Sequence, residues 1–101
     1  MTYRVRFTEE AKEDLGRLYE FLLESDLGAA DEALTALEDG LAMLRRFPFA
    51  CRKAVDGKYG PLLRELLVPF GKTGYVVLFE ISGRETVTIL AVRHQRESDY
   101  Y

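Results

Sequence analysis

The C-terminal stretch of the chain gathers residue types that could bind an anion or act on one. The apolar run Ile89-Leu90-Ala91-Val92 leads directly into Arg93, His94 and Arg96. An apolar strand that ends in cations presents them at a sheet edge, where they can meet a phosphate or an acidic partner. Because guanidinium groups bind carboxylates and phosphates through paired hydrogen bonds, Arg93 and Arg96 are predicted docking residues.

His94 is the only histidine of the chain, and histidine is the side chain whose ordinary pKa lies nearest neutral pH. The sequence favours a polar or partner contact for His94 over a role as general base. Arg64 has two open interpretations, an anion-binding residue or an ion-pair partner of an acid on a neighbouring strand. Lys53 and Lys58 belong to a basic stretch, residues 51–61, whose length without periodicity is more typical of a functional loop.

Charge is distributed unevenly along the chain, although the net charge is only −3. Residues 8–39 contain eleven acids and two bases, whereas residues 45–64 contain six bases and one acid. This asymmetry favours one face for an anionic or acidic partner. The overall acidity argues against affinity based on neutralising phosphates, so contact with nucleic acid is expected only indirectly.

Composition indicates one domain spanning residues 1–101, because a chain of 101 residues with 48% hydrophobic content can bury a core. A single cysteine, Cys51, excludes an internal disulfide and a thiolate metal cluster. We expect neither a metal nor a cofactor. No apolar stretch resembles a signal sequence or a membrane span, so we expect no membrane partner and a cytoplasmic location.

Hydrophobic periodicity predicts the elements that position these residues. Residues 3–7 alternate apolar and cationic side chains, as in a strand with one buried face. Thr8 can cap a following helix, and a break at residues 26–28 separates it from a second helix that ends at Phe47-Pro48. The short break predicts an antiparallel helical hairpin. Its two apolar faces consist of Ala11, Leu15, Leu18 and Leu22, and of Ala30, Ala33, Leu34, Leu37, Leu41 and Leu44.

Three further strands are predicted in the second half of the chain, at residues 64–68, 74–81 and 85–94. Short turns that contain glycine join them and can form hairpins. The resulting order is β-α-α-β-β-β. We therefore predict an α+β fold, in which a helical hairpin packs on one side of a mostly antiparallel four-stranded sheet.

Several short pieces, taken together in their order and spacing, resemble the RelE/ParE toxin superfamily from about Tyr3 to Tyr101. The pieces are Tyr3-Arg4-Val5, Thr8-x-x-Ala11-x-x-Asp14-Leu15, Ala29-Ala30, Leu44-x-x-x-Pro48, Arg64-Glu65-Leu66, Tyr75-x-Val77-x-Phe79 and Val87-x-Ile89-Leu90-x-Val92-Arg93-His94-x-Arg96. The resemblance implies the toxin of a bacterial type II toxin–antitoxin pair. Such a toxin is silenced by the C-terminal segment of a cognate antitoxin, ParD-like or of another family.

The superfamily contains two activities. ParE-like members inhibit DNA gyrase and stabilise plasmids, whereas RelE-like members cleave messenger RNA on the ribosome without a metal. For a nuclease, the resemblance implies a catalytic set of Arg64, Lys53 or Lys58, Arg96 and Tyr101. However, Gln95 stands where the superfamily pattern has a catalytic arginine, and the Arg-His-Gln-Arg ending is closer to ParE-like sequences.

The leading hypothesis is therefore a ParE-like toxin that inhibits gyrase by binding it, with no chemistry of its own. An acidic or amphipathic antitoxin segment is expected to lie across the sheet and the apolar groove beside the helical hairpin. The predicted binding residues are Arg64, Arg93 and Arg96 as anchors, with His94, Lys53 and Lys58. The alternative is a ribosome-dependent endoribonuclease, and a toxin that has kept antitoxin binding but lost its activity also stays open.

Overall fold

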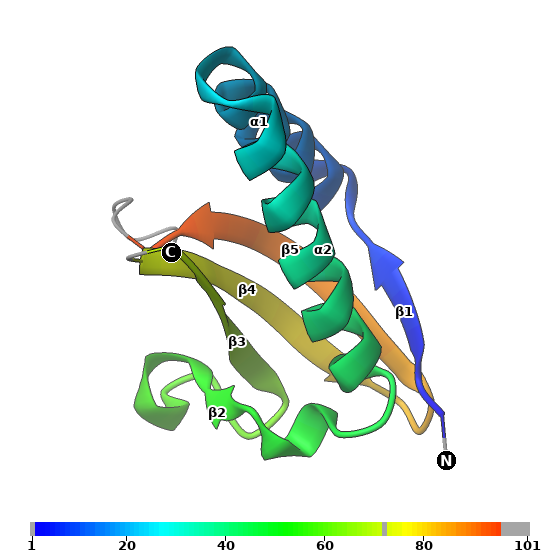
Figure 1. Ribbon diagram of the computed structural model, residues 1–101. Coiled ribbons are helices and arrows are strands. Elements are labelled where there is room, and N and C mark those ends of the chain that lie inside the picture. The colour runs from blue at the N-terminus through cyan, green and yellow to red at the C-terminus, as the bar shows by residue number, and fades with distance from the viewer. Residues whose placement is uncertain (1, 72, 96–101) are drawn as a thin grey trace.

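The computed structural model describes residues 2–71 and 73–95, which form two long helices and one sheet. The elements are β1 (Arg4–Phe7), α1 (Glu9–Ser25), α2 (Leu27–Leu44), the short 3₁₀ helix η1 (Pro48–Ala50), β2 (Arg52–Lys53), the 3₁₀ turn η2 (Ala54–Gly57), β3 (Leu63–Phe70), β4 (Thr73–Ser82) and β5 (Thr86–His94). In Figure 1 the turn between α1 and α2 lies at one end of the molecule, and the segment from η1 to η2 lies at the other.

The strands form one sheet in the order β1-β5-β4-β3-β2. β1 runs parallel to β5, whereas the pairs β5–β4, β4–β3 and β3–β2 are antiparallel. The predicted α+β class and the mostly antiparallel sheet are therefore confirmed. Within the described residues no helix has the length and apolar character needed to cross a bilayer.

The stretch at residues 51–61 is partly structured, which corrects the prediction of a four-stranded sheet. It contains the two-residue strand Arg52–Lys53, whose members pair with Glu65 and Arg64 of β3. Two paired residues are too few to produce a periodic pattern in the sequence, so this fifth strand was missed. β3 is also longer than the predicted residues 64–68.

The helical hairpin forms at the two predicted break points. Thr8 caps α1, since its Oγ1 accepts a hydrogen bond from the Ala11 N–H at 3.1 Å. Asp26 ends α1 and caps α2, because its carboxylate accepts from the N–H groups of Gly28 at 2.8 Å and Ala29 at 3.3 Å. One residue thus serves both helices, and the connection needs no separate loop.

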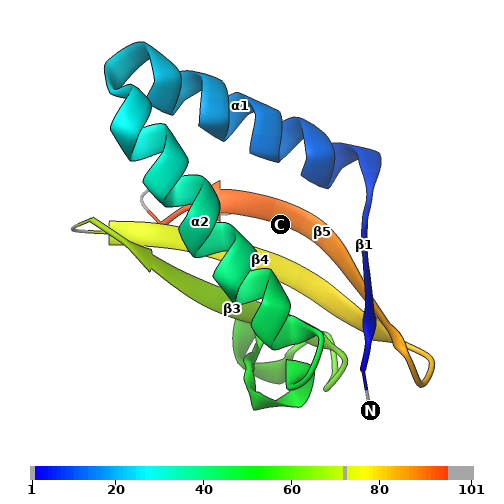
Figure 2. The same cartoon turned by 45° about the vertical axis from the view of Figure 1, so that its right-hand side comes forward.

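The main core lies between the hairpin and one face of the sheet, which α1 and α2 cover (Figure 2). Tyr75, Val77, Phe79 and Ile81 alternate along β4 and are all buried on the helix-facing side, as the sequence predicted. A smaller buried cluster on the other face joins Leu78 of β4 and Ala91 of β5 to Ala54 of η2. Alternate residues of β4 thus point to the helix-facing side and to the far side of the sheet. A residue of β3 or β5 that pairs with a β4 residue lies on the same face as that residue.

Candidate functional site

Arg93, near the end of β5, is held against the first helix. Its guanidinium pairs with the carboxylate of Asp14 in α1 and donates to the Val92 carbonyl at 3.3 Å. Asp14 also accepts from the Val92 N–H at 3.0 Å, and Arg17 Nη2 lies 3.5 Å from the same carboxylate. Because β1 pairs with β5 only as far as Ile89, Asp14 satisfies a backbone donor that β1 does not reach.

The charge of Asp14 is stabilised by these contacts. Burial raises the pKa of Asp14, but the hydrogen bonds from Arg93 and the Val92 N–H, together with the positive charge of Arg93, leave that pKa below its ordinary value. An ionised Asp14 in turn neutralises Arg93 within the fold. The Arg93 side chain keeps 27% of its surface exposed, so it is not fully enclosed by these contacts.

His94 belongs to an aromatic group at the same end of the sheet. Its ring meets the ring of Tyr75 edge-on, with centroids 5.7 Å apart and planes at 85°. Tyr75 in turn stacks on Phe70 of β3 at 5.8 Å. His94 therefore lies against the buried Tyr75, whereas the predicted residues Arg96 and Tyr101 lie outside the described part of the chain.

Arg64 makes its described contacts with the segment that precedes β3. Its Nε donates to the Pro61 carbonyl at 2.7 Å, and its Nη1 donates to the carbonyls of Phe49 at 3.2 Å and Cys51 at 2.8 Å. The guanidinium also lies over the Phe49 ring, 5.1 Å from its centroid. The sequence left Arg64 as an anion-binding residue or as an ion-pair partner of an acid on a neighbouring strand. The contacts described here are of neither kind, because they are with carbonyls and an aromatic ring. Its role in binding stays a prediction.

Cys51 is buried beneath Arg64. Burial raises the pKa of the Cys51 thiol, although the charge of Arg64 acts in the opposite direction. A thiol with a raised pKa is mostly protonated at neutral pH, and it is therefore a poor nucleophile. This environment agrees with a structural role for Cys51.

The two loop lysines lie on either side of a strained turn. Lys53 is exposed on β2, and Lys58 lies over the ring of Tyr59 at 5.6 Å. Between them, Val55 and Asp56 have φ angles of 49° and 51°, in the left-handed region that non-glycine residues seldom adopt. For a β-branched residue such as Val55 this conformation is costly, so the turn holds backbone strain close to exposed cations.

The register of the sheet separates the predicted residues into two groups. Arg64 pairs with Phe79 of β4, whose side chain is on the helix-facing side, and Arg93 pairs with Val76 on the opposite side. Val76 and Phe79 are three positions apart along β4, a span of roughly 10 Å. Lys53 accompanies Arg64 as its cross-strand partner, whereas His94 accompanies Arg93. Of the predicted nuclease set, the structure describes Arg64, Lys53 and Lys58, and it places Arg64 beside Lys53 on paired strands.

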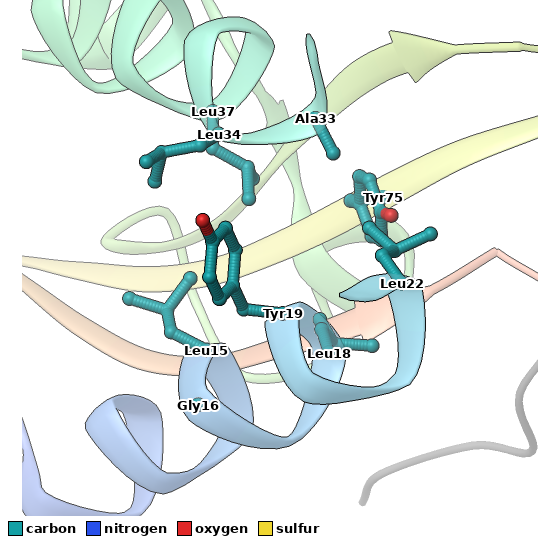
Figure 3. A pocket seen from close by; sticks show the side chains of 9 residues that line it. All are labelled: Leu15, Gly16, Leu18, Tyr19, Leu22, Ala33, Leu34, Leu37 and Tyr75. Carbon is teal, nitrogen blue, oxygen red and sulfur yellow. The ribbon is translucent and has the colours of Figure 1, made fainter. Parts of the chain in front are cut away.

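An apolar pocket of about 270 Å³ lies between the two helices. Figure 3 shows Leu15, Tyr19 and Leu22 of α1 facing Leu34 and Leu37 of α2, with Tyr75 of the sheet beside them. The full lining is Leu15, Gly16, Leu18, Tyr19, Leu22, Ala33, Leu34, Leu37 and Tyr75. Because Tyr75 also contacts His94, the pocket adjoins the cationic end of β5.

The family model of the ParE toxin of the type II toxin–antitoxin system parDE matches residues 5–99. The chain belongs to this family. It is thus the toxin of a type II toxin–antitoxin system within the RelE/ParE superfamily, as the sequence predicted.

Relatives of this ParE-family chain carry both superfamily names. It is 33% identical over 97 residues to "Toxin RelE1" of Caulobacter vibrioides, covering 96% of this chain and 98% of the relative. A solved RelBE2 toxin–antitoxin complex from Mycobacterium tuberculosis contains a chain that is 27% identical, with a TM-score of 0.62 over 94% of this chain and 100% of that one. A chromosomal ParDE system from P. aeruginosa shares the fold, with a TM-score of 0.67 at 16% identity over 92% and 96% of the two chains.

Two features of this ParE-family chain escaped the reasoning from sequence. Gly16 lines the pocket, but a glycine inside a helical pattern gives no sign of which face it occupies. Asp14 appeared in the sequence analysis only within the motif Thr8-x-x-Ala11-x-x-Asp14-Leu15, since its partners Val92 and Arg93 are more than 75 residues away. The family motif contains both Asp14 and Arg93, two residues of opposite charge. Their joint presence in the motif was the one sign in the sequence that they could form an ion pair.

Proposed function

We propose that this toxin inhibits DNA gyrase by binding it, and that the C-terminal segment of a cognate antitoxin neutralises it. The observation that carries the proposal is the engagement of Arg64 within the fold. Its Nε donates to the Pro61 carbonyl, its Nη1 donates to the carbonyls of Phe49 and Cys51, and its guanidinium lies over the Phe49 ring. A metal-independent nuclease needs its cations and proton-transfer groups around one phosphate. A guanidinium already held by carbonyls suits docking on a protein better.

The surface proposed to meet gyrase is the end of the molecule formed by residues 45–64. Phe47, Phe49 and Tyr59 are each more than half exposed there. Six bases and one acid lie in the same residues, which gives this end a positive charge. Exposed aromatic side chains combined with arginines are typical of protein interfaces, and the charge fits an acidic partner surface. Lys53, Lys58 and Arg64 belong to this end, so this proposal moves Arg64 from the antitoxin anchors predicted from the sequence to the gyrase surface.

The surface proposed for the antitoxin is the pocket between α1 and α2 with the adjoining end of β5. An apolar pocket suits the apolar side chains of an amphipathic segment. A segment that leaves the pocket beside Tyr75 would next meet His94 and the exposed part of Arg93. Carboxylates on that part of the segment would complement these two residues, with Arg96 as a further predicted anchor.

The test measures supercoiling by purified gyrase and cleavage of messenger RNA on programmed ribosomes, each with the toxin added. Inhibited supercoiling with intact message is the expected result. A double variant, Phe47→Ser with Tyr59→Ser, should weaken the inhibition by at least tenfold. Phe21→Ser is the matched control, because Phe21 is comparably exposed but belongs to the helical hairpin. Equal loss in both variants would contradict the assignment of the gyrase surface.

A second candidate function is cleavage of messenger RNA on the ribosome. It is favoured by the 33% identity to a protein named as a RelE toxin. The catalytic set would be Arg64, Lys53 or Lys58, Arg96 and Tyr101. Message cut in the ribosome assay, with unaffected gyrase, would establish this candidate and overturn the first.

A further inference from the structure

Gly16 occupies the interior of α1, where glycine weakens a helix relative to alanine. It is exposed, and it lines the mouth of the apolar pocket. A Cβ atom placed on Gly16 would meet nothing within 4 Å in this structure. The internal packing of the described residues therefore gives no reason for a glycine at this position.

Gly40 of α2 provides the contrasting case. A Cβ atom there would come within 3.0 Å of Leu66 Cδ2 and 3.1 Å of Val68 Cγ2, both on β3. Gly40 thus allows α2 to approach the sheet closely, which is a reason within the fold. Gly16 weakens its helix as Gly40 does, but no described atom lies close enough to exclude a side chain at position 16. If a glycine is needed there, the atoms that need the space belong to something outside the described chain.

The mouth of the pocket is acidic. Tyr19, which lines the pocket, donates its hydroxyl to the Asp31 carboxylate at 3.4 Å. Exposed Glu20 lies one helical turn after Gly16, and exposed Glu38 lies one turn after the pocket residue Leu34. The base Lys12, one turn before Gly16, is itself paired with Glu9 at 3.4 Å. An occupant of the pocket therefore meets apolar side chains at its centre and carboxylates at its margin.

We propose that Gly16 is reserved for the backbone of a helical antitoxin segment that crosses α1 at close range. This inference rests on the antitoxin site proposed above. It adds which features of an antitoxin segment the site would recognise. A small residue of the segment lies over Gly16, because only small side chains let two helices approach this closely. Its apolar residues enter the pocket, and Lys or Arg residues on its flank meet Glu20, Asp31 and Glu38.

The experiment compares Gly16→Ala with Gly40→Ala in two measurements, the melting temperature of the unbound toxin and its Kd for the purified full-length cognate antitoxin. Gly16→Ala should raise the melting temperature by about 2–8 °C, since it improves helix propensity without a clash. It should also raise the Kd at least tenfold. Gly40→Ala should lower the melting temperature while the folded protein keeps its Kd within about twofold.

A second pair of variants tests the charge of the occupant. Glu38→Lys lies at the mouth of the pocket, whereas the position of Glu32→Lys is about 120° away around the same helix. At low salt Glu38→Lys should raise the Kd at least fivefold more than Glu32→Lys does, and the difference should shrink at high salt. Equal effects of the two substitutions would overturn the cationic flank.

The outcomes separate this inference from the proposed function. If wild-type toxin does not bind the antitoxin at all, the proposed antitoxin site falls, and this inference falls with it. Normal antitoxin affinity in Gly16→Ala would overturn the role of Gly16 alone. A change confined to self-association, measured by sedimentation, would identify a second copy of this chain as the occupant and would also overturn the proposal.

Discussion

Asp14 joins the first helix to the last strand through one carboxylate. It satisfies the Val92 N–H and neutralises Arg93, and both partners lie more than 75 residues further along the chain. Removing the carboxylate leaves the Val92 N–H without its described acceptor and deprives a half-buried guanidinium of its ion-pair partner. Such losses are usually larger than those from exposed ion pairs, because the groups left behind are partly shielded from water.

We predict that Asp14→Ala lowers the free energy of unfolding by about 2–3 kcal/mol at pH 7. Asp14→Asn should cost less, because an amide oxygen can still accept from Val92. Chemical denaturation of the variants at neutral pH measures both effects. As a control, Glu9→Ala removes an exposed pair with Lys12 and should change stability by less than about 0.5 kcal/mol.

The same residue should make stability depend on acid. The pKa of Asp14 is lower in the folded protein than its ordinary value, so the unfolded chain takes up this proton first as the pH falls. The contribution of Asp14 is therefore complete above about pH 5 and is lost as the pH falls below about 3.9 and through the folded pKa. The stability difference between wild type and Asp14→Ala should shrink over this range. A constant difference down to pH 2 would contradict the lowered pKa.

Arg64 should act on stability as well as on any binding. Replacing it with methionine removes three hydrogen bonds to carbonyls and the contact with Phe49, while much of the aliphatic stem is kept. We expect the free energy of unfolding to fall by about 1–2 kcal/mol. As a control, Lys53→Met changes an exposed side chain of the neighbouring β2 and should cost less than about 0.5 kcal/mol. Equal effects would show that the carbonyl contacts contribute little.

At the scale of elements, the helical hairpin and the long strands followed from the sequence because their signals are local. The cap at Thr8 and the shared cap at Asp26 act within three residues, and alternation along β4 is visible in its own residues. β2 and η2 could not be predicted in this way. β2 exists only because β3 pairs with it, and η2 is held by the burial of Ala54 against the far face of the sheet.

The strained turn η2 leads to a prediction of unusual sign. Val55→Gly should be neutral or should stabilise the protein by up to about 1 kcal/mol, because glycine adopts the observed φ of 49° without steric cost. The comparison is Val76→Gly in β4, where glycine weakens a strand and the stability should fall. Thermal unfolding of both variants, each compared with wild type, measures the two changes in stability. Clear destabilisation by Val55→Gly would show that packing of the valine outweighs its backbone strain.

At the scale of the whole molecule, the candidate binding surfaces lie at two ends. The pocket and the Arg93–His94 end of β5 are on the side of the helical hairpin, and the basic aromatic end is formed by residues 45–64 (Figure 1). Charge counts along the sequence detected both regions. They could not show that Arg64 and Arg93 start from opposite faces, because that depends on the pairing register of β3, β4 and β5.

The position of β5 in the sheet has a consequence for the order of folding. β5 lies between β4 and β1, although it is the last strand in the sequence. β1 therefore has no partner until β5 is available, and the Thr8 and Asp14 contacts to β5 must wait with it. The helical hairpin and the β3–β4 hairpin are local and can form earlier, whereas the closure of a loop of about 80 residues is slow.

Folding kinetics should record this order. Val5→Ala in β1 should mainly accelerate unfolding, with a Φ-value of about 0–0.3, whereas Val77→Ala in β4 should also slow folding. A chain emerging from the ribosome would then remain open along one edge until β5 has been synthesised. The sheet would become complete only after β5 has been synthesised, when β5 joins the first strand to the rest of the sheet.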